Sequence, residues 1–353
     1  MKEGWEYKSL GDVCEILDSR RKPITKNKRE SGTIPYYGAT GILDYVKDYI
    51  FDEKLVLLGE DGAKWGAGEN SAYIVEGKTW VNNHAHALRP KREHLIDELL
   101  VYYLNFANLQ PFITGVTVPK LNQEKMRSIE IPVPPLSEQQ AIVDYLDSAF
   151  AKIDAMKANA EKALNEAKAL FQASLKEMLE PKEGWEEKTI EHFARIVHGK
   201  NQKEVIDSNG SYPIYGSGGN IMGYANAYLC EAGTTILGRK GTIDNPLFID
   251  ERFWNVDTAF GIIAKDNCNK KYLYYSIKKV DWAKLNTGTT LPSLTQNVVY
   301  NVAMCAPPLS EQQSIIATLD SLKSKVDRLQ ENYDKISQEC DALKQAILRQ
   351  VFE

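Results

Sequence analysis

The side chains with the clearest binding chemistry lie in a short basic segment near the N-terminus. Six cations fall within ten residues that also include a proline: Arg20, Arg21, Lys22, Lys26, Lys28 and Arg29. Lys200 and Lys203 occupy the equivalent place in the second half of the chain. Two similar basic loops suit a long repeating polyanion such as DNA, because each cation can neutralise a phosphate. An ordinary solvated surface loop is the alternative interpretation.

Further polar and aromatic side chains near these loops could contact bases. In the major groove, arginine pairs with guanine and asparagine with adenine. The sequence therefore adds these candidates for DNA binding: Tyr36, Lys64, Asn82, Asn83, His84, Asn201, Ser217, Arg239 and Lys240.

Catalytic motifs are absent from the sequence. There is no P-loop, no H-E-x-x-H and no G-x-S-x-G, and the H-x-H pair of His84 and His86 lacks an evident third metal ligand. Asn245-Pro246-Leu247-Phe248 is similar to the loop with which adenine methyltransferases hold a flipped base, but Leu247 breaks that motif, which favours a structural turn. We expect no catalytic residue, metal or cofactor in this chain.

Composition predicts an ordinary globular protein with two or three domains. Its 353 residues carry 43 basic and 48 acidic side chains, and residues 137–180 and 310–353 hold the whole acidic excess. No apolar run is long enough for a membrane span, and the first residues lack the apolar core of a signal peptide. The five cysteines are scattered without a C-x-x-C pair. These features favour the reducing cytoplasm.

The chain is a tandem duplication. KEGWEY at residues 2–7 returns as KEGWEE at 182–187, and PPLSEQQAIVDYLDS at 134–148 returns as PPLSEQQSIIATLDS at 307–321. TGVTVPKLNQ at 114–123 answers TGTTLPSLTQ at 287–296. The predicted organisation is a globular domain over 1–136, a helix over 137–180, a second globular domain over 181–309 and a second helix over 310–353.

The globular domains are predicted to be mixed α/β, with many short strands. β-Branched and aromatic runs such as IPYYG, SAYIV and TTILG are separated by glycine and Asn/Asp turns. One helix is expected at His94–Asn105 and its equivalent at Lys271–Lys279.

Two long helices are predicted to pair as an antiparallel coiled coil about 65 Å long. Ser137 and Ser310 are the expected N-caps, with Gln140 and Gln313 completing a capping box. The expected seam of the first helix is Ile142, Leu146, Ala149, Ile153, Met156, Ala160, Ala163, Ala167, Leu170 and Ser174. The expected seam of the second is Ile315, Leu319, Leu322, Val326, Leu329, Tyr333, Ile336, Cys340, Leu343 and Ile347.

The chain resembles the specificity subunits of type I restriction-modification systems. The resemblance is carried by VPKLNQEKMRSIEIPVPPLSEQQAIVDYLD, by its second copy LPSLTQNVVYNVAMCAPPLSEQQSIIATLD, and by the repeated KEGWE and the IPYYGATG segment. It implies two target-recognition domains in a pseudo-twofold arrangement, each recognising one half of a bipartite double-stranded DNA sequence. It also implies that the helices fix the gap between the half-sites and dock two methyltransferase subunits.

The resemblance further implies that the chain is non-catalytic. S-adenosylmethionine, ATP and Mg²⁺ would bind to the methyltransferase subunits and to the separate restriction subunits. Positions identical in both domains, such as Trp80 and Trp254, should form the shared scaffold, while base-reading residues should lie among those that differ. The alternatives are a coiled-coil adaptor with two protein-binding heads, or an enzyme with an unrecognised active site.

Overall fold

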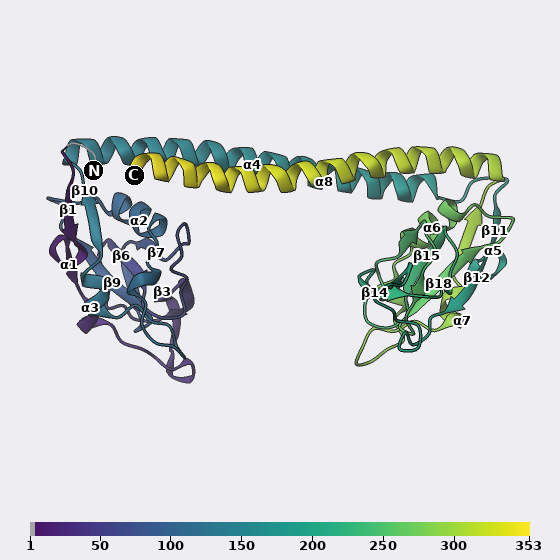
Figure 1. Ribbon diagram of the computed structural model, residues 1–353, viewed down its shortest axis with the longest axis horizontal. Coiled ribbons are helices and arrows are strands. Elements are labelled where there is room, and N and C mark those ends of the chain that lie inside the picture. The colour runs from purple at the N-terminus through teal and green to yellow at the C-terminus, as the bar shows by residue number, and fades with distance from the viewer. Residues whose placement is uncertain (1–3) are drawn as a thin grey trace. The chain divides into compact units, whose positions relative to one another are not determined.

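The computed structural model describes residues 4–353 and shows one succession of elements built twice. The first unit comprises the chain up to Ala160 together with Tyr333–Glu353, and the second comprises Glu161–Asn332. Two long helices, α4 (Leu136–Met178) and α8 (Leu309–Phe352), each contribute to both units. Figure 1 labels the elements.

The first unit contains three small sheets. Its strands are β1 (Glu6–Ser9), β2 (Cys14–Ile16), β3 (Ser31–Gly38), β4 (Gly41–Val46), β5 (Phe51–Asp52), β6 (Leu55–Gly59), β7 (Ala72–Val75), β8 (Lys78–Val81), β9 (Ala85–Pro90) and β10 (Glu130–Val133). They pair in the orders β1-β10, β2-β9-β6-β7 and β4-β3-β8-β5, and only β3 and β8 run parallel. Its short helices are α1 (Leu10–Val13), α2 (Asp97–Phe106) and α3 (Gln123–Arg127).

The second unit repeats this plan. Its strands are β11 (Glu186–Thr189), β12 (Ala194–His198), β13 (Tyr212–Tyr215), β14 (Ile221–Ala225), β15 (Thr234–Gly238), β16 (Leu247–Ile249), β17 (Trp254–Asn255), β18 (Ala259–Ala264) and β19 (Ala303–Ala306). The sheets are β11-β19, β12-β18-β15-β16 and β14-β13-β17, and β13 runs parallel to β17. Its short helices are α5 (Ile190–Phe193), α6 (Lys270–Lys279) and α7 (Gln296–Tyr300). The predicted mixed α/β fold of both domains is confirmed.

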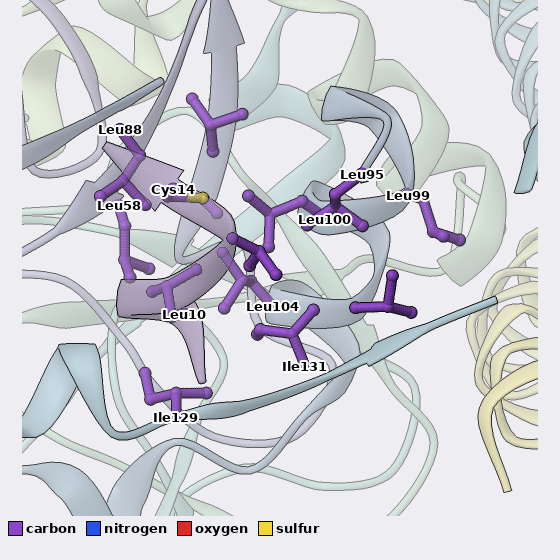
Figure 2. Close-up of a cluster of buried hydrophobic side chains, with 14 of the residues drawn as sticks. Leu10, Cys14, Leu58, Leu88, Leu95, Leu99, Leu100, Leu104, Ile129 and Ile131 are labelled. Atoms are coloured by element: carbon purple, nitrogen blue, oxygen red, sulfur yellow. The ribbon is translucent and has the colours of Figure 1, made fainter. Parts of the chain in front are cut away.

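The main core of the first unit lies between its four-stranded sheet β2-β9-β6-β7 and the helices. Figure 2 shows Leu58 of β6 and Leu88 of β9 facing Leu100 and Leu104 of α2. All four are fully buried, which makes the apolar run of β6 the centre of the unit. The second unit builds its corresponding core from β15, β18 and α6.

A buried glutamine joins each long helix to its unit. Gln139 accepts the Ile96 N–H at 2.9 Å and donates to the His94 carbonyl at 2.7 Å. Gln312 likewise accepts the Asn269 N–H at 2.8 Å. These bonds fix the starts of α2 and α6 by tertiary contacts. Both helices were predicted, but α2 begins three residues later and ends one residue later than expected, and α6 begins one residue earlier. The first glutamine of each P-P-L-S-E-Q-Q motif is therefore a structural clamp.

The predicted capping boxes are wrong. Helix α4 begins at Leu136, because the Pro135 carbonyl already accepts the N–H groups of Glu138 and Gln139, so Ser137 lies inside the helix. Gln140 instead bonds to the next turn, where its side chain donates to Asp144 at 2.8 Å. Helix α8 begins in the same way at Leu309, which places Ser310 inside it.

Within each unit the two long helices run antiparallel, as predicted. In the first unit Lys344 lies 2.6 Å from Asp154 and Lys157 lies 3.4 Å from Asp341, so numbers rise along one helix as they fall along the other. In the second unit Lys168 donates to a side chain of α8 at 2.7 Å. In α8, residues from Ile315 to Cys340 follow the predicted seam.

Three of the ten predicted α4 seam residues, Met156, Ala163 and Leu170, are exposed. Leu146 and Ile153 are buried as expected, but Met156 and Leu170 are each 59% exposed. Leu164 and Phe171 are buried in place of Ala163 and Leu170, and Phe171 packs against Tyr275 of α6. From Ile153 onward, two sets of residues alternate steps of three and four: one includes Ala163 and Leu170, and the other includes Leu164 and Phe171. Tertiary packing selects the set with the larger side chains. In α8, Leu343 is likewise exposed and Leu348 is buried.

Candidate nucleic-acid interface

In the first unit, four loops meet at one end of the sheet β2-β9-β6-β7. They are residues 17–29 after β2, 59–64 after β6, 82–84 before β9 and the closed loop 114–120. The Glu60 N–H donates to the His84 carbonyl at 2.8 Å, and the Leu121 N–H donates to the Glu60 carbonyl at 2.8 Å. Because β2 and β6 end where β9 begins, the sheet topology brings these loops together.

The second unit assembles the equivalent loops with the same bonds. The Arg239 N–H donates to the Thr258 carbonyl and the Leu294 N–H to the Arg239 carbonyl, both at 2.8 Å. The Lys200 N–H donates to the Asn255 carbonyl at 3.0 Å. Residues 198–206, 238–242, 255–258 and 287–293 therefore form a matching surface at the end of β12-β18-β15-β16.

An ion network beneath the first loop surface connects its loops. The Arg21 guanidinium lies 2.5 Å from Glu60 and 3.2 Å from Asp18, and Lys120 lies 2.6 Å from Glu60. Burial alone would raise the pKa values of both carboxyl groups. His86 and Arg21 instead hold the pKa of Asp18 below its ordinary value, and Lys120 and Arg21 do the same for the pKa of Glu60.

The same network contains the one group of possible metal ligands found among residues 4–353: Asp18, Glu60 and His86. Both carboxylates already bind cationic side chains. Both ring nitrogens of His86 are also engaged, with Nδ1 2.6 Å from Asp18 and Nε2 2.7 Å from the Leu121 carbonyl. No ligand atom is left free for an ion, so the geometry supports an internal ion network that fixes the loops.

The cations of the basic loop differ in whether an acidic side chain pairs with them. Arg21 pairs with Glu60 and Arg29 with Asp44. Arg20 is exposed, but it pairs with Glu53 and stacks on the Phe51 ring at 4.5 Å. Lys22, Lys26 and Lys28 are exposed and form no ion pair with the rest of the described chain, residues 4–353. The lysines, rather than the arginines, are the cations available to a polyanion.

A repeated tryptophan holds each basic loop. The Trp80 indole donates to the Lys22 carbonyl at 2.7 Å, and the Trp254 indole donates to the Lys200 carbonyl at 3.0 Å. Trp80 pairs with Tyr36 across the parallel strands, and Trp254 pairs with Ile214 in the same way. The expectation that these identical residues belong to the shared scaffold agrees with this geometry.

Two of the predicted DNA-binding residues are buried and cannot contact DNA in this structure. Tyr36 is 1% exposed, and its hydroxyl accepts the Ile24 N–H at 2.9 Å beneath the basic loop. Asn82 is 2% exposed, and its side chain accepts the His84 N–H at 2.8 Å. Both residues shape loops whose other side chains face outward, a distinction that residue type alone does not reveal.

The remaining candidates lie on the two loop surfaces. Lys64 and Asn83 are exposed, and His84 is half exposed beside Asp61. In the second unit the exposed candidates are Lys200, Asn201, Lys203 and Lys240, while Ser217 and Arg239 are half-buried.

The turns 59–62 and 238–241 carry opposite charge at equivalent positions. Glu60 and Asp61 in the first correspond to Arg239 and Lys240 in the second. Lys120, which neutralises Glu60, corresponds to Ser293, whose backbone forms a β-bridge with Lys240. One backbone framework thus presents different charges in the two units.

Sequence reasoning overlooked several apolar side chains that the two units expose. Ile42 and Leu43 of edge strand β4, and Ile221 and Met222 of edge strand β14, are about half exposed. Loops 114–120 and 287–293 also expose apolar residues. The repetition of T-G-x-T-x-P was visible as a mark of the duplication, and its position before α3 and α7 could have suggested a shared surface loop.

Comparison with known proteins identifies the family. The family model of the type I restriction modification DNA specificity domain matches twice, at residues 2–166 and 182–338. The chain therefore belongs to the type I restriction-modification specificity family. It is 31% identical to a "putative type I restriction enzyme specificity subunit" of Haemophilus influenzae, over 92% of this chain and 89% of that protein.

Other relatives agree in length and fold. The chain is 22% identical to the type I restriction enzyme MjaVIII specificity subunit of Methanocaldococcus jannaschii, over 92% of this chain and 87% of that protein. A chain from a structural study of type I R-M complex assembly shares its fold, with a TM-score of 0.79, 18% identity and coverage of 100% and 98% of the two chains. The HsdS subunit of Thermoanaerobacter tengcongensis also shares the fold, with a TM-score of 0.56, 18% identity and coverage of 100% and 97%.

These findings make the chain a DNA-recognition subunit of the type I restriction-modification class and disfavour the adaptor alternative. Among residues 4–353, no helix has the length and apolarity needed to cross a membrane.

Proposed function

We propose that each unit recognises one half of a bipartite DNA target with its loop surface. That surface lies at the end of the sheet β2-β9-β6-β7 in the first unit and of β12-β18-β15-β16 in the second. The observation that carries this proposal is that both units hold their loops on the same backbone framework but expose different side chains from it. The loops are held by equivalent hydrogen bonds in both units, whereas Glu60 and Asp61 are replaced by Arg239 and Lys240. Dissimilar half-sites require such dissimilar contacts on a common scaffold.

The exposed lysines position the DNA, and the differing side chains read it. Lys22, Lys26 and Lys28 in the first unit correspond to Lys200 and Lys203 in the second, and all are free to reach phosphates. Asn83 and Arg239 have the donors and acceptors that distinguish base edges in the major groove.

The paired helices α4 and α8 dock two methyltransferase subunits, and their length sets the gap between the half-sites. The support is the family membership and the duplication, which provides two equivalent surfaces for two copies of one partner. S-adenosylmethionine, ATP and Mg²⁺ belong to the methyltransferase and restriction subunits, and the chain contributes no catalytic residue. The complex works in the cytoplasm, where its DNA is found.

Methylome sequencing of a host with and without this gene tests the proposal. We expect one bipartite adenine-methylated motif to disappear when the gene is deleted. The purified chain, incubated alone with DNA, S-adenosylmethionine and Mg²⁺, should neither methylate nor cleave. An unchanged methylome, or methylation by the chain alone, would contradict the assignment.

A further inference from the structure

The loops 114–120 and 287–293 are a surface feature that the two units share. Both read T-G-x-T-x-P, and each closes on itself. The Thr114 N–H donates to the Lys120 carbonyl at 2.8 Å and the reverse bond is also 2.8 Å, while the Thr287 N–H donates to the Ser293 carbonyl at 2.9 Å. The loops are therefore preformed rather than ordered by a ligand.

A glycine in each loop permits its tight closure. Gly115 has a φ of +89°, and a Cβ there would lie 2.4 Å from the Val118 carbonyl oxygen. A Cβ on Gly288 would lie 2.0 Å from the Leu291 carbonyl oxygen. No other residue fits either position, so both units depend on glycine for the shape of this loop.

The closed loops point apolar side chains into solvent. Val116 is fully exposed, Val118 is 64% exposed, and Leu291, the equivalent of Val118, is 53% exposed. Side chains of this kind normally pack inward, and here both loops hold one outward at the equivalent position of Val118 and Leu291, while Val116 corresponds to Thr289. The exposure is thus a repeated property of the fold.

The loops are continuous with the proposed DNA surface. The backbone of Lys120, at the end of the first loop, forms an antiparallel β-bridge with Asp61, and that of Ser293, at the end of the second, forms one with Lys240. The Gly241 N–H also donates to the Pro292 carbonyl at 2.9 Å. Each apolar tip thus lies beside one lysine, Lys120 in the first unit and Lys240 in the second, and next to the other loops of the proposed DNA surface. A DNA groove offers a matching surface, because phosphates line both sides of an apolar stack of bases.

We propose that both loops are apolar wedges that enter a DNA groove and pack against a base step in each half-site. This inference rests on the proposed function. The loops are alike because they act on the geometry and stacking common to both half-sites, and not on base sequence. Side chains such as leucine and proline, inserted at a base step, partly unstack it and bend the duplex. The differing loops around them then read the bases.

The test uses the full chain assembled with its methyltransferase partner and a duplex carrying its target. The variant V116S/V118S removes the apolar tip of the first loop without changing charge, and V118L, which copies the second loop, is the matched control. We expect V116S/V118S to bind the target about tenfold more weakly, with an unchanged dependence on salt. V118L should bind like the wild type.

A second measurement reports insertion directly. 2-Aminopurine placed in turn at each step of the first half-site should brighten at one position when the wild-type complex binds, because unstacking relieves its quenching. V116S/V118S should lose this signal. With the probe placed in the second half-site instead, L291S should lose the corresponding signal.

Unchanged affinity and fluorescence in V116S/V118S would overturn the wedge while leaving the proposed function intact. Failure of that variant to assemble with the methyltransferase would also overturn it, because the loop would then be a protein-docking element. Failure of the wild-type complex to bind DNA would instead contradict the proposed function.

Discussion

Neutralising the three exposed lysines of the first basic loop should flatten the salt dependence of DNA binding. Lys22, Lys26 and Lys28 make no ion pair within residues 4–353, so each can release one counterion from DNA. At about 0.9 in slope per contact, the triple glutamine variant should lower the slope of log K against log salt by up to about 2.7. Between 50 and 200 mM salt, the wild type should then lose about 40-fold more affinity than the variant.

The assay is a binding titration of the methyltransferase-assembled chain at several salt concentrations, with target and non-target duplexes. Both duplexes should weaken together, because phosphate contacts carry no sequence information. A control with the same charge change replaces Lys91, Lys188 and Lys284, which are exposed and lie outside both the loop surfaces and the helices α4 and α8. An unchanged slope in the loop variant, or an equal change in the control, would refute the assignment of this loop to DNA.

Two further predictions concern stability. Gln139→Ala should lower the free energy of unfolding of the first unit by about 1–3 kcal/mol, because it orphans buried backbone groups at the start of α2, whereas Gln140→Ala should have little effect; urea unfolding distinguishes the two. The lowered pKa values of Asp18 and Glu60 give stabilisation that is present above their ordinary values near ~4 and is lost as pH falls through the lowered ones. Arg21→Gln should therefore shift acid unfolding of this unit, followed by circular dichroism, to higher pH, and an unshifted midpoint would show that the network does not couple to folding.

The sequence predicted those features that depend on local pattern. Heptad spacing and the Pro-Pro segments located α4 and α8, and the repeats located two domains of the same kind. Features that depend on distant contacts were not predictable. The phase of the α4 seam was decided by the packing of Phe171 on Tyr275, and the start of α2 by Gln139.

The candidate site shows the same limit. The basic loops were found from composition, yet the burial of Tyr36 and Asn82 depends on the pairing of β3 with β8. Asp18 and His86 are 68 residues apart in sequence, and only the sheet brings them together in the ion network. Spacing along the chain carries no trace of such a contact.

The central claim is that each unit specifies its own half of the DNA target. The most direct test exchanges residues 181–309 for the corresponding domain of another specificity subunit, with methylome sequencing of cells that also carry the methyltransferase partner. The account predicts that the second half-site changes to that of the donor, while the first half-site and the gap stay as they were. A change in both half-sites, or an unchanged motif, would contradict it.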